Sequence, residues 1–417
     1  MTQSSSTARR PLLLLCHRIP YPPNKGDKIR SFHLLRYLSE RFDVHLGAFV
    51  DDADDWQHAD ALSRLCRSCR LLPRPKVPAP LRLARCVAQS EPLTLPLYHQ
   101  PAMQDWVADT VRAEGIDIAV VFSGAMGQYL LDGRFDDLRR VVDFVDVDSD
   151  KWRQYAQGKP WPLSWLYRRE AATLAAFEQR LHRRCQASLF VSAAEAALFR
   201  RQVVEHPERV DHVNNGVDHE FFSPDHAFAS PFAAGETALV FTGAMDYWPN
   251  IDAVSWFARE VLPPLRQRFA DLRFYIVGSK PASAVQKLAA LPGVVVTGRV
   301  ADVRPYLQHS LAAVAPLRVA RGVQNKVLEA MAMARPVLVS SAGLEGITAQ
   351  DAREVLLAES ADDYSRHLTA VIEGRHAGLG AAARARVRND YSWDTAFLRL
   401  AQWMGLPGEP SRVANHG

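Results

Sequence analysis

Two series of short, continuously apolar segments alternate with stretches of helical periodicity, and this pattern limits the fold more than any other feature. Strands that are apolar throughout are typical of parallel sheets with helices on both faces. Strand–helix alternation predicts an α/β fold with a doubly wound, Rossmann-like sheet in each half. The expected strands are residues 11–16, 44–50, 116–122, 141–145 and 187–192 in the first half, and 237–243, 273–278, 293–298, 311–317 and 336–341 in the second.

The length of 417 residues also favours two domains, joined by the turn-rich segment 214–236. We expect a first domain over residues 1–220, a second over 221–390 and a final segment over 391–417. Apolar residues at helical spacing in 391–404 predict a helix that crosses back to the first domain. Ligands of such sheets bind beyond the carboxyl ends of the strands, so a substrate would lie in a central cleft between the domains.

Composition narrows the class of protein. A hydrophobic content of 48% with 23% charged residues is typical of a globular enzyme, and a net charge of +4 gives no general platform for nucleic acid. The five cysteines are sparse, and the pair Cys66 and Cys69 has no second pair at zinc spacing. The apolar run near the start ends at His17, too short for a signal core, and no segment reaches the length of a membrane span. We therefore expect a cytoplasmic protein, with any membrane contact at the inner face of the plasma membrane.

The stretch "GVQNKVLEAMAMARPVLVSS" over 322–341 has the features of an anion site. Gly322 would open a helix to close approach by a ligand, and a helix N-terminus attracts anions. Asn325, Lys326 and Glu329 share a helix face, and Arg318 ends the preceding strand. A ligand with phosphate at the start of the helix and a diol near Glu329 would be a nucleotide. The alternative is an ordinary Lys–Glu pair on a helix surface.

The pattern "PLRVARGVQNKVLEAMAMARPVLVSS…EGI" resembles the donor site of GT-B glycosyltransferases, family four in particular. Other matching stretches occur in order: "PYPPNKGDKIRSFHLLRYLSERFDVHLGAF", "NNGVDHEFFSP", "LVFTGAMDYWPNIDAVSWF" and "DYSWD". Within that family, "PYPPNKGDKIR", "VVDFVDVDSDKW" and "GVQNKVLEAMA" look most like sugar transferases of PEP-CTERM/exosortase exopolysaccharide systems.

The resemblance implies roles for the donor-binding residues. Arg318 and Lys326 would neutralise the donor diphosphate, Glu329 would bind the ribose hydroxyls, and Gly243 would lie in a glycine turn facing the donor. No metal or other cofactor is implied. The chain departs from the family in two places: Arg321 stands where a second glutamate is common, and "AMDYWPN" lacks an arginine frequent after the turn glycine.

Two stretches of the first half carry acceptor-side candidates. In "PPNKGDKIR", Gly26 permits close approach, and Asp27, Lys28 and Arg30 would line the loop. The resemblance puts this loop at the cleft, where Gly26 would bind the donor by facing its sugar or diphosphate; the alternative is a solvated loop. In "VVDFVDVDSDKW", the strand end presents the carboxylates of Asp146, Asp148 and Asp150.

Carboxylates at that strand end could bind a metal, accept a proton from an acceptor hydroxyl or bind sugar hydroxyls. Capping of the next helix by Asp148 or Ser149 is the structural alternative. Asp146 is the first candidate for a catalytic or acceptor-orienting carboxylate.

Two basic stretches suggest membrane contact. Residues 61–90 contain seven arginines or lysines and no acid, with leucines between them. The stretch "KWRQYAQGKPWPLSWLYRRE" places Trp152, Trp161 and Trp165 among cations. Anionic lipid would suit both stretches; the alternative is two solvated helical faces with core aromatics.

These patterns lead to one expected activity. The chain is expected to be a retaining glycosyltransferase that moves a sugar from a nucleotide diphosphate donor to a glycan or lipid-linked saccharide. Arg318 and Lys326 would stabilise the leaving diphosphate, and retention follows from the resemblance alone. The alternatives are a nucleotide-sugar epimerase and a non-catalytic nucleotide-sugar-binding subunit of a polysaccharide assembly complex.

Overall fold

The chain forms two structural units in the computed structural model, which describes residues 9–23, 26–76, 78, 86–87, 90–320 and 322–406. The first unit comprises Met1–Asn214 together with Phe397–Gly417, and the second comprises Asn215–Ala396. The first boundary thus falls a few residues before the expected one, and the end of the chain returns to the first unit.

A seven-stranded sheet forms the centre of the first unit, and every pairing within it is parallel. The strand order is β3-β2-β1-β4-β5-β6-β7, so the chain winds outward from β1 in both directions. Five strands match the expected ones, and two edge strands, β3 and β7, are added. The strands are β1 (Pro11–Cys16), β2 (Asp43–Val50), β3 (Ser68–Pro73), β4 (Ile118–Phe122), β5 (Arg139–Val145), β6 (Ala187–Phe190) and β7 (Val210–His212).

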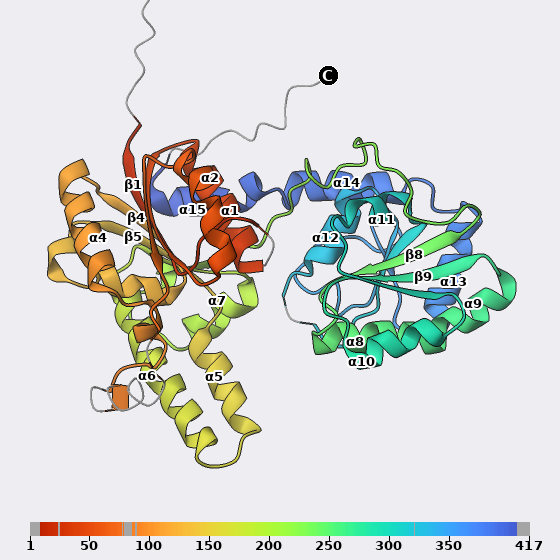
Figure 1. The fold of residues 1–417 in the computed structure, drawn as a ribbon, viewed down its shortest axis with the longest axis horizontal. Helices are drawn as coiled ribbons and strands as arrows, with labels where there is room; N and C mark the ends of the chain where they lie inside the picture. Colours follow the sequence, from red (N-terminus) through yellow and green to blue (C-terminus); the bar gives the residue numbers. More distant parts are fainter. Residues whose placement is uncertain are drawn as a thin grey trace, which may run out of the picture. The chain divides into compact units, whose positions relative to one another are not determined.

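Helices connect these strands, as parallel pairing requires. Figure 1 shows α5 and α6 as a helical hairpin that projects away from the sheet. The α-helices are α1 (Gly26–Ser39), α2 (Ala59–Ser63), α4 (Pro101–Glu114), α5 (Asp148–Gln157), α6 (Leu163–Arg183) and α7 (Ala193–Arg200). Short 3₁₀ segments cover Ala53–His58, Leu95–Tyr98, Gly124–Leu130, Gly133–Phe135 and Pro207–Arg209.

The second unit has a six-stranded parallel sheet in the order β10-β9-β8-β11-β12-β13. Its strands are β8 (Thr237–Thr242), β9 (Leu272–Val277), β10 (Val294–Gly298), β11 (Ala312–Ala315), β12 (Val337–Val339) and β13 (Leu356–Leu357). Its helices are α8 (Trp248–Trp256), a π-helical turn (Phe257–Val261), α9 (Leu262–Arg268), α10 (Ser283–Gln286), a 3₁₀ turn (Lys287–Ala290), α11 (Arg304–His309), α12 (Asn325–Ala332), α13 (Ala361–Ile372) and α14 (Leu379–Asp390). Figure 1 shows α8 and α10 on one side of this sheet and α11, α12 and α14 on the other.

Burial on both faces explains why the strands are apolar throughout. In β8, Leu239 and Phe241 belong to the core under one face, whereas Ala238 and Val240 belong to the core under the other. Successive strand residues point to opposite faces, so a sheet covered on both sides needs apolar residues at every position. The two Rossmann-like, parallel-sheet domains predicted from this pattern are confirmed.

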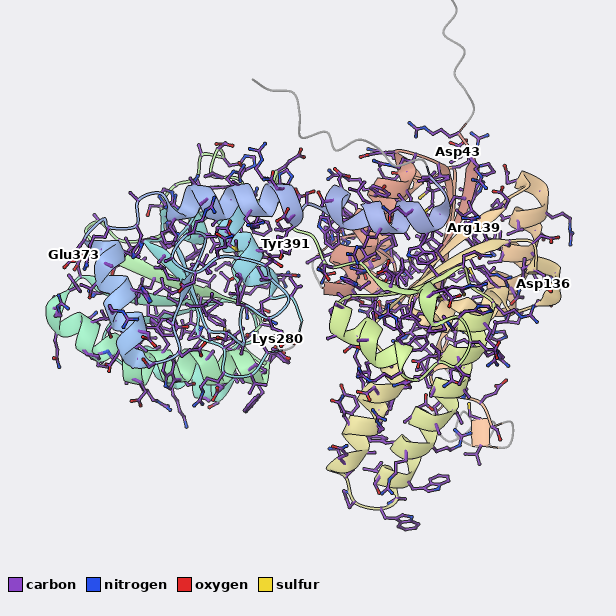
Figure 2. The ribbon with its side chains drawn as sticks, turned by 180° about the vertical axis from the view of Figure 1, so that it is seen from behind. Asp43, Asp136, Arg139, Lys280, Glu373 and Tyr391 are labelled. Carbon is purple, nitrogen blue, oxygen red and sulfur yellow. The ribbon has the colours of Figure 1, made fainter. Side chains whose placement is uncertain are left out.

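The last helix, α15 (Trp393–Met404), lies close to the expected range 391–404. From Phe397 onward it belongs to the first unit, where the Phe397 ring packs 5.3 Å from that of Tyr37. Trp403 Nε1 donates to Asp211 at 3.0 Å, and Arg139, labelled in Figure 2, donates to the Trp403 carbonyl. Among the described residues, no helix is both long and apolar enough to cross a bilayer.

Candidate functional site

In the second unit, the end of β8 and the first turn of α12 meet around Lys326. The Lys326 ammonium donates to Asn250 Oδ1 at 2.5 Å and lies 4.5 Å from the centre of the Phe241 ring. Asn250 belongs to α8, and its amide nitrogen donates to the Ala244 carbonyl at 2.9 Å. The ammonium is therefore bonded to a neutral amide and faces an aromatic ring, so its charge is available to an anion.

Two glycines allow the segments that follow β8 and β9 to pass close to each other. A Cβ on Gly278 would lie 1.6 Å from the Gly243 carbonyl oxygen, so only glycine fits there. Gly243 has φ +155°, and a Cβ on it would lie 2.8 Å from the Asn250 amide nitrogen. The turn glycine named from the sequence thus lies beside Lys326, at the carboxyl end of β8.

Helix α12 begins at Asn325 rather than at Gly322, so the expectation that Gly322 opens the helix is wrong. Gly322 lies in the preceding loop with φ +65°, a left-handed conformation that favours glycine. The N-cap residue, Gln324, makes no side-chain capping bond to the first turn. Asn325 Oδ1 is buried and has no hydrogen-bond partner within the described part of the chain. A helix N-terminus, a cation and an unmatched buried acceptor therefore converge here.

The electrostatics of α12 reflect burial. Desolvation lowers the pKa of Lys326 to about 8, although the negative charge of Glu329 raises it. Desolvation also raises the pKa of Glu329 to about 7, although the Lys326 charge lowers it. Both side chains are thus held in a setting that disfavours their charged forms, which is common where proteins bind charged ligands.

Arg318 differs from Lys326 in its surroundings. Its side chain is 57% exposed and forms an ion pair with Asp252 of α8 through Nε and Nη2. Lys326 and Arg318 therefore bond to different residues of α8, and Arg318 would have to leave Asp252 to bind a diphosphate. Arg321, the other notable position in this loop, lies outside the described residues.

A cavity of about 180 Å³ lies beyond the carboxyl ends of β11, β12 and β13, with Arg318 in its wall. Ser340, Glu359 and Tyr364 also line it. The Tyr364 hydroxyl is buried and has no hydrogen-bond partner among the residues described. Nothing in the local sequence marked these residues, because they come from separate strand ends and from α13.

In the first unit, the carboxyl end of β1 leads to a cluster around Asp27. Arg18 pairs with Asp27 at 2.5 Å, and His17 Nε2 lies 3.5 Å from the same carboxylate. Burial opposes ionisation of Asp27, but the His17 hydrogen bond and the Arg18 charge hold its pKa at about 2. His17 Nδ1 is buried without a partner among the described atoms. His17 was not among the expected site residues; its place directly after a buried strand was the available signal.

Lys28 and Arg30 do not line a loop, and that expectation is wrong. Both lie in α1, where Lys28 pairs with Asp55 at 2.6 Å and Arg30 with Asp143 at 2.8 Å; their side chains are 2% and 1% exposed. Gly26 is the first residue of this helix, and a Cβ there would meet nothing within 4 Å. The preceding Asn24 and Lys25 lie outside the described residues.

Asp146 follows β5 directly and pairs with Lys151 at 2.6 Å, and Lys151 also reaches Asp148 at 3.3 Å. The preceding residue, Val145, has φ +71°, an unusual conformation for a β-branched residue and one found at functional sites. Asp150, the third expected carboxylate, pairs with Arg153. The strand end thus presents Asp146 on a strained turn.

Capping of α5 by Asp148 or Ser149 is not observed. Its N-cap residue is Val147, whose N–H donates to Glu195 at 2.8 Å, and the Ser149 N–H donates to Glu178 at 3.1 Å. Burial raises the pKa of Glu178 to about 8, against the lowering effect of the Ser149 hydrogen bond. Carboxylates from α6 and α7 therefore accept hydrogen bonds from the N–H groups at the start of α5. No group of three or more His, Cys, Asp or Glu side chains within the described residues is arranged to hold a metal ion.

The basic stretch 61–90 is only partly described, because residues 77, 79–85 and 88–89 lie outside. Its described part includes the edge strand β3, with Arg67 just before it and Arg70 within it, both exposed. Charged residues on an edge strand also prevent pairing with other chains, which is a sufficient structural reason for them.

Comparisons with known proteins agree with this arrangement. Residues 236–373, about a third of the chain, match the family described as glycosyl transferases group 1. A comparison with curated protein sequences returned no match.

Solved structures resemble the whole chain at low identity. Sucrose-phosphate synthase from Thermosynechococcus elongatus is 17% identical with a TM-score of 0.62, covering 95% of this chain and 98% of that one. HepE of Anabaena in complex with UDP is 14% identical with a TM-score of 0.63, covering 95% and 99%. WaaG, a glycosyltransferase involved in lipopolysaccharide biosynthesis, is 16% identical with a TM-score of 0.61, covering 95% and 100%. The fold is therefore GT-B, and the likeness to the group 1 family extends over residues 236–373 of the second unit.

The buried pair of Lys28 and Asp55 gives a stability prediction. Asp55→Ala leaves a buried ammonium without its carboxylate, and we expect the free energy of unfolding to fall by about 3–5 kcal/mol. Asp117→Ala is the control, because Asp117 forms an exposed ion pair with Arg10 and should cost less than about 1 kcal/mol. Urea denaturation measures both. Equally small losses would mean that Lys28 is solvated and accessible, as the sequence had suggested.

Proposed function

We propose that the protein is a glycosyltransferase that moves a sugar from a nucleotide diphosphate sugar to a glycan or lipid-linked saccharide. The observation that carries this proposal is Lys326, an ammonium bonded to a neutral amide at the N-terminus of α12, beside the Gly243 turn. It lies within the segment that matches the group 1 family. Similar structures hold UDP and UDP-glucose, so UDP-sugars are the first donors to test.

In the proposed reaction, the bond between the anomeric carbon and the diphosphate oxygen breaks while an acceptor hydroxyl oxygen bonds to that carbon. Negative charge then grows on the leaving diphosphate. Lys326 and the N-terminal dipole of α12 would stabilise that charge, and Arg318 would add a second cation after leaving Asp252. Gly322 and Asn325 would present backbone and amide groups to the donor. Glu329 would accept hydrogen bonds from the ribose hydroxyls.

On the acceptor side, we propose that Asp146 orients the attacking hydroxyl or accepts its proton. Its carboxylate lies 2.6 Å from the Lys151 ammonium, and the Val145 turn fixes its direction. Asp27 and Asp148 are the neighbouring carboxylates for sugar hydroxyls, and Gly26 leaves space beside them. Lys28 and Arg30 would act only by positioning α1.

The finer assignment rests on the sequence resemblance. We propose a retaining, family-four hexosyltransferase that works without a metal in exopolysaccharide biosynthesis of the PEP-CTERM type, in the cytoplasm at the inner face of the plasma membrane. Turnover of UDP-sugars with saccharide acceptors, followed by release of UDP, tests the activity, and proton NMR of the product gives its anomeric configuration. An isomeric nucleotide sugar formed without acceptor would identify an epimerase. Binding without turnover of any donor would indicate a non-catalytic subunit.

The depressed pKa of Lys326 gives a readout of phosphate contact. In the unfolded chain this lysine stays charged up to its ordinary pKa of 10.5. In the folded protein it loses its proton as the pH rises through about 8. A bound diphosphate favours the charged form, so UDP binding at pH 8.5 should take up a substantial fraction of a proton. Calorimetry in buffers of different ionisation enthalpy measures this uptake.

Uridine, which lacks phosphate, is the matched ligand and should cause no proton uptake at this residue. Lys326→Met should abolish the uptake with UDP and weaken UDP binding far more than uridine binding. Equal weakening for both ligands would show that Lys326 does not contact phosphate.

Glu329 gives a second test, on the ribose contact. Glu329→Gln keeps the size of the side chain and should weaken donor binding by roughly 1.5–3 kcal/mol, the range for hydrogen bonds to charged groups. Since burial raises the pKa of Glu329 to about 7, ionisation costs stability as the pH rises through that value. The variant should therefore be no less stable than the wild type above pH 7.

A 2′,3′-dideoxy donor completes a double-mutant cycle with Glu329→Gln. It should bind the wild type poorly and the variant about equally poorly, because one contact is removed in either way. Losses that simply add would mean that Glu329 is not the ribose ligand. Titration calorimetry provides the four affinities.

A further inference from the structure

The helical hairpin of the first unit ends in a surface that the proposed transfer reaction does not use. Helices α5 and α6 run side by side and are joined by residues 158–162 (Figure 1). The rings of Trp152 and Tyr167 pack edge to face, 5.0 Å apart, and connect the two helices. Glu178 of α6 accepts a hydrogen bond of 2.5 Å from the Ser149 hydroxyl of α5. The hairpin is therefore a braced element, and its far end, residues 155–168, is here called the hairpin tip.

Large apolar side chains are exposed at the hairpin tip. Trp161 is 81% exposed, Trp165 51%, Tyr155 57% and Leu163 44%. Trp152, by contrast, packs against the core, in agreement with the alternative of core aromatics for that residue. Figure 2 shows side chains extending outward around the end of the hairpin. Clustered exposed rings of this kind mark an interaction surface.

The stretch that contains the hairpin tip, residues 151–169, carries charge of a single sign. Residues 151–169 contain five lysines or arginines and no acid. Three of these cations are engaged: Lys151 and Arg153 with aspartates of the same region, and Arg169 with the carbonyls of Cys86 and Glu91. The other two, Lys159 and Arg168, are exposed and form no ion pair within the described part of the chain. They are free to meet an anionic surface.

We propose that the hairpin tip docks on an anionic lipid bilayer. Trp and Tyr prefer the headgroup level of a membrane, where the ring is apolar and its polar atom stays wet. Lys159 and Arg168 are close in sequence to Trp161 and Trp165 and would bind anionic headgroups. The rings occupy the protruding end of a hairpin with cations around them, which suits a soft, negatively charged plane. The contact would be peripheral, and its measurement needs no donor or acceptor, so it stands apart from the proposed transfer.

Flotation of the full chain with vesicles tests the proposal. Vesicles of equal parts phosphatidylglycerol and phosphatidylcholine should carry the protein at low salt and release much of it at 0.5 M NaCl, because screening weakens exposed charges. Pure phosphatidylcholine vesicles should bind weakly. Trp161→Ala with Trp165→Ala should lower the partition coefficient by roughly tenfold or more. Lys159→Gln with Arg168→Gln should lower it by roughly twenty-five-fold at low salt, since each cation contributes about fivefold.

Trp56→Ala is the matched control, because it removes another exposed tryptophan of the first unit, outside the hairpin, and should leave binding unchanged. Acyl-chain-brominated lipids should quench the fluorescence of the wild type, and the Trp161/Trp165 double variant should lose most of that quenching. Absence of flotation at low salt, or flotation that both tip variants retain, would overturn the proposal. So would a wild type that self-associates through the tip in sedimentation equilibrium and leaves the vesicles unbound.

Discussion

Burial of both faces of each parallel sheet is the constraint on which this structure depends. Because helices cover both sides, polar groups have little place along the strands, and Leu12, Leu13, Leu14 and Leu15 of β1 are fully buried. Charged and strained residues concentrate instead at the carboxyl ends of the strands, where the chain turns. His17, Gly243 and Arg318 follow strand ends, and Val145 is the last residue of β5. The candidate sites of both units are thus a consequence of how the sheets are covered.

The two candidate sites differ in how charge is balanced. In the first unit, the buried cations of α1 meet carboxylates at short distance, and Asp146 has Lys151. In the second unit, Lys326 bonds to a neutral amide, although burial already disfavours its charge. A buried cation without a carboxylate partner destabilises the folded protein, and a bound anion can restore that stability. The first arrangement holds a fold together, and the second is suited to a ligand.

Much of the architecture was predictable from the sequence because it depends on local periodicity. The strands, their parallel pairing and the returning helix follow from apolar runs and helical spacing, and the α12 residues were found because they are close in sequence. Lys28 and Arg30 were misinterpreted because their partners, Asp55 and Asp143, are 27 and 113 residues away. Asn250 and Gly278 were missed for the same reason: each gains its role only when two strand ends and two helices meet.

The return of the chain to the first unit has a consequence for biosynthesis. Tyr37, Arg139 and Asp211 contact a helix that the ribosome completes only after the whole second unit has been made. A nascent chain stopped after residue 396 has both sheets but leaves the Tyr37 ring and the Asp211 carboxylate uncovered. The first unit is therefore the first to be synthesised and the last to be completed. Prematurely terminated chains would expose an apolar surface of the kind that chaperones and proteases recognise.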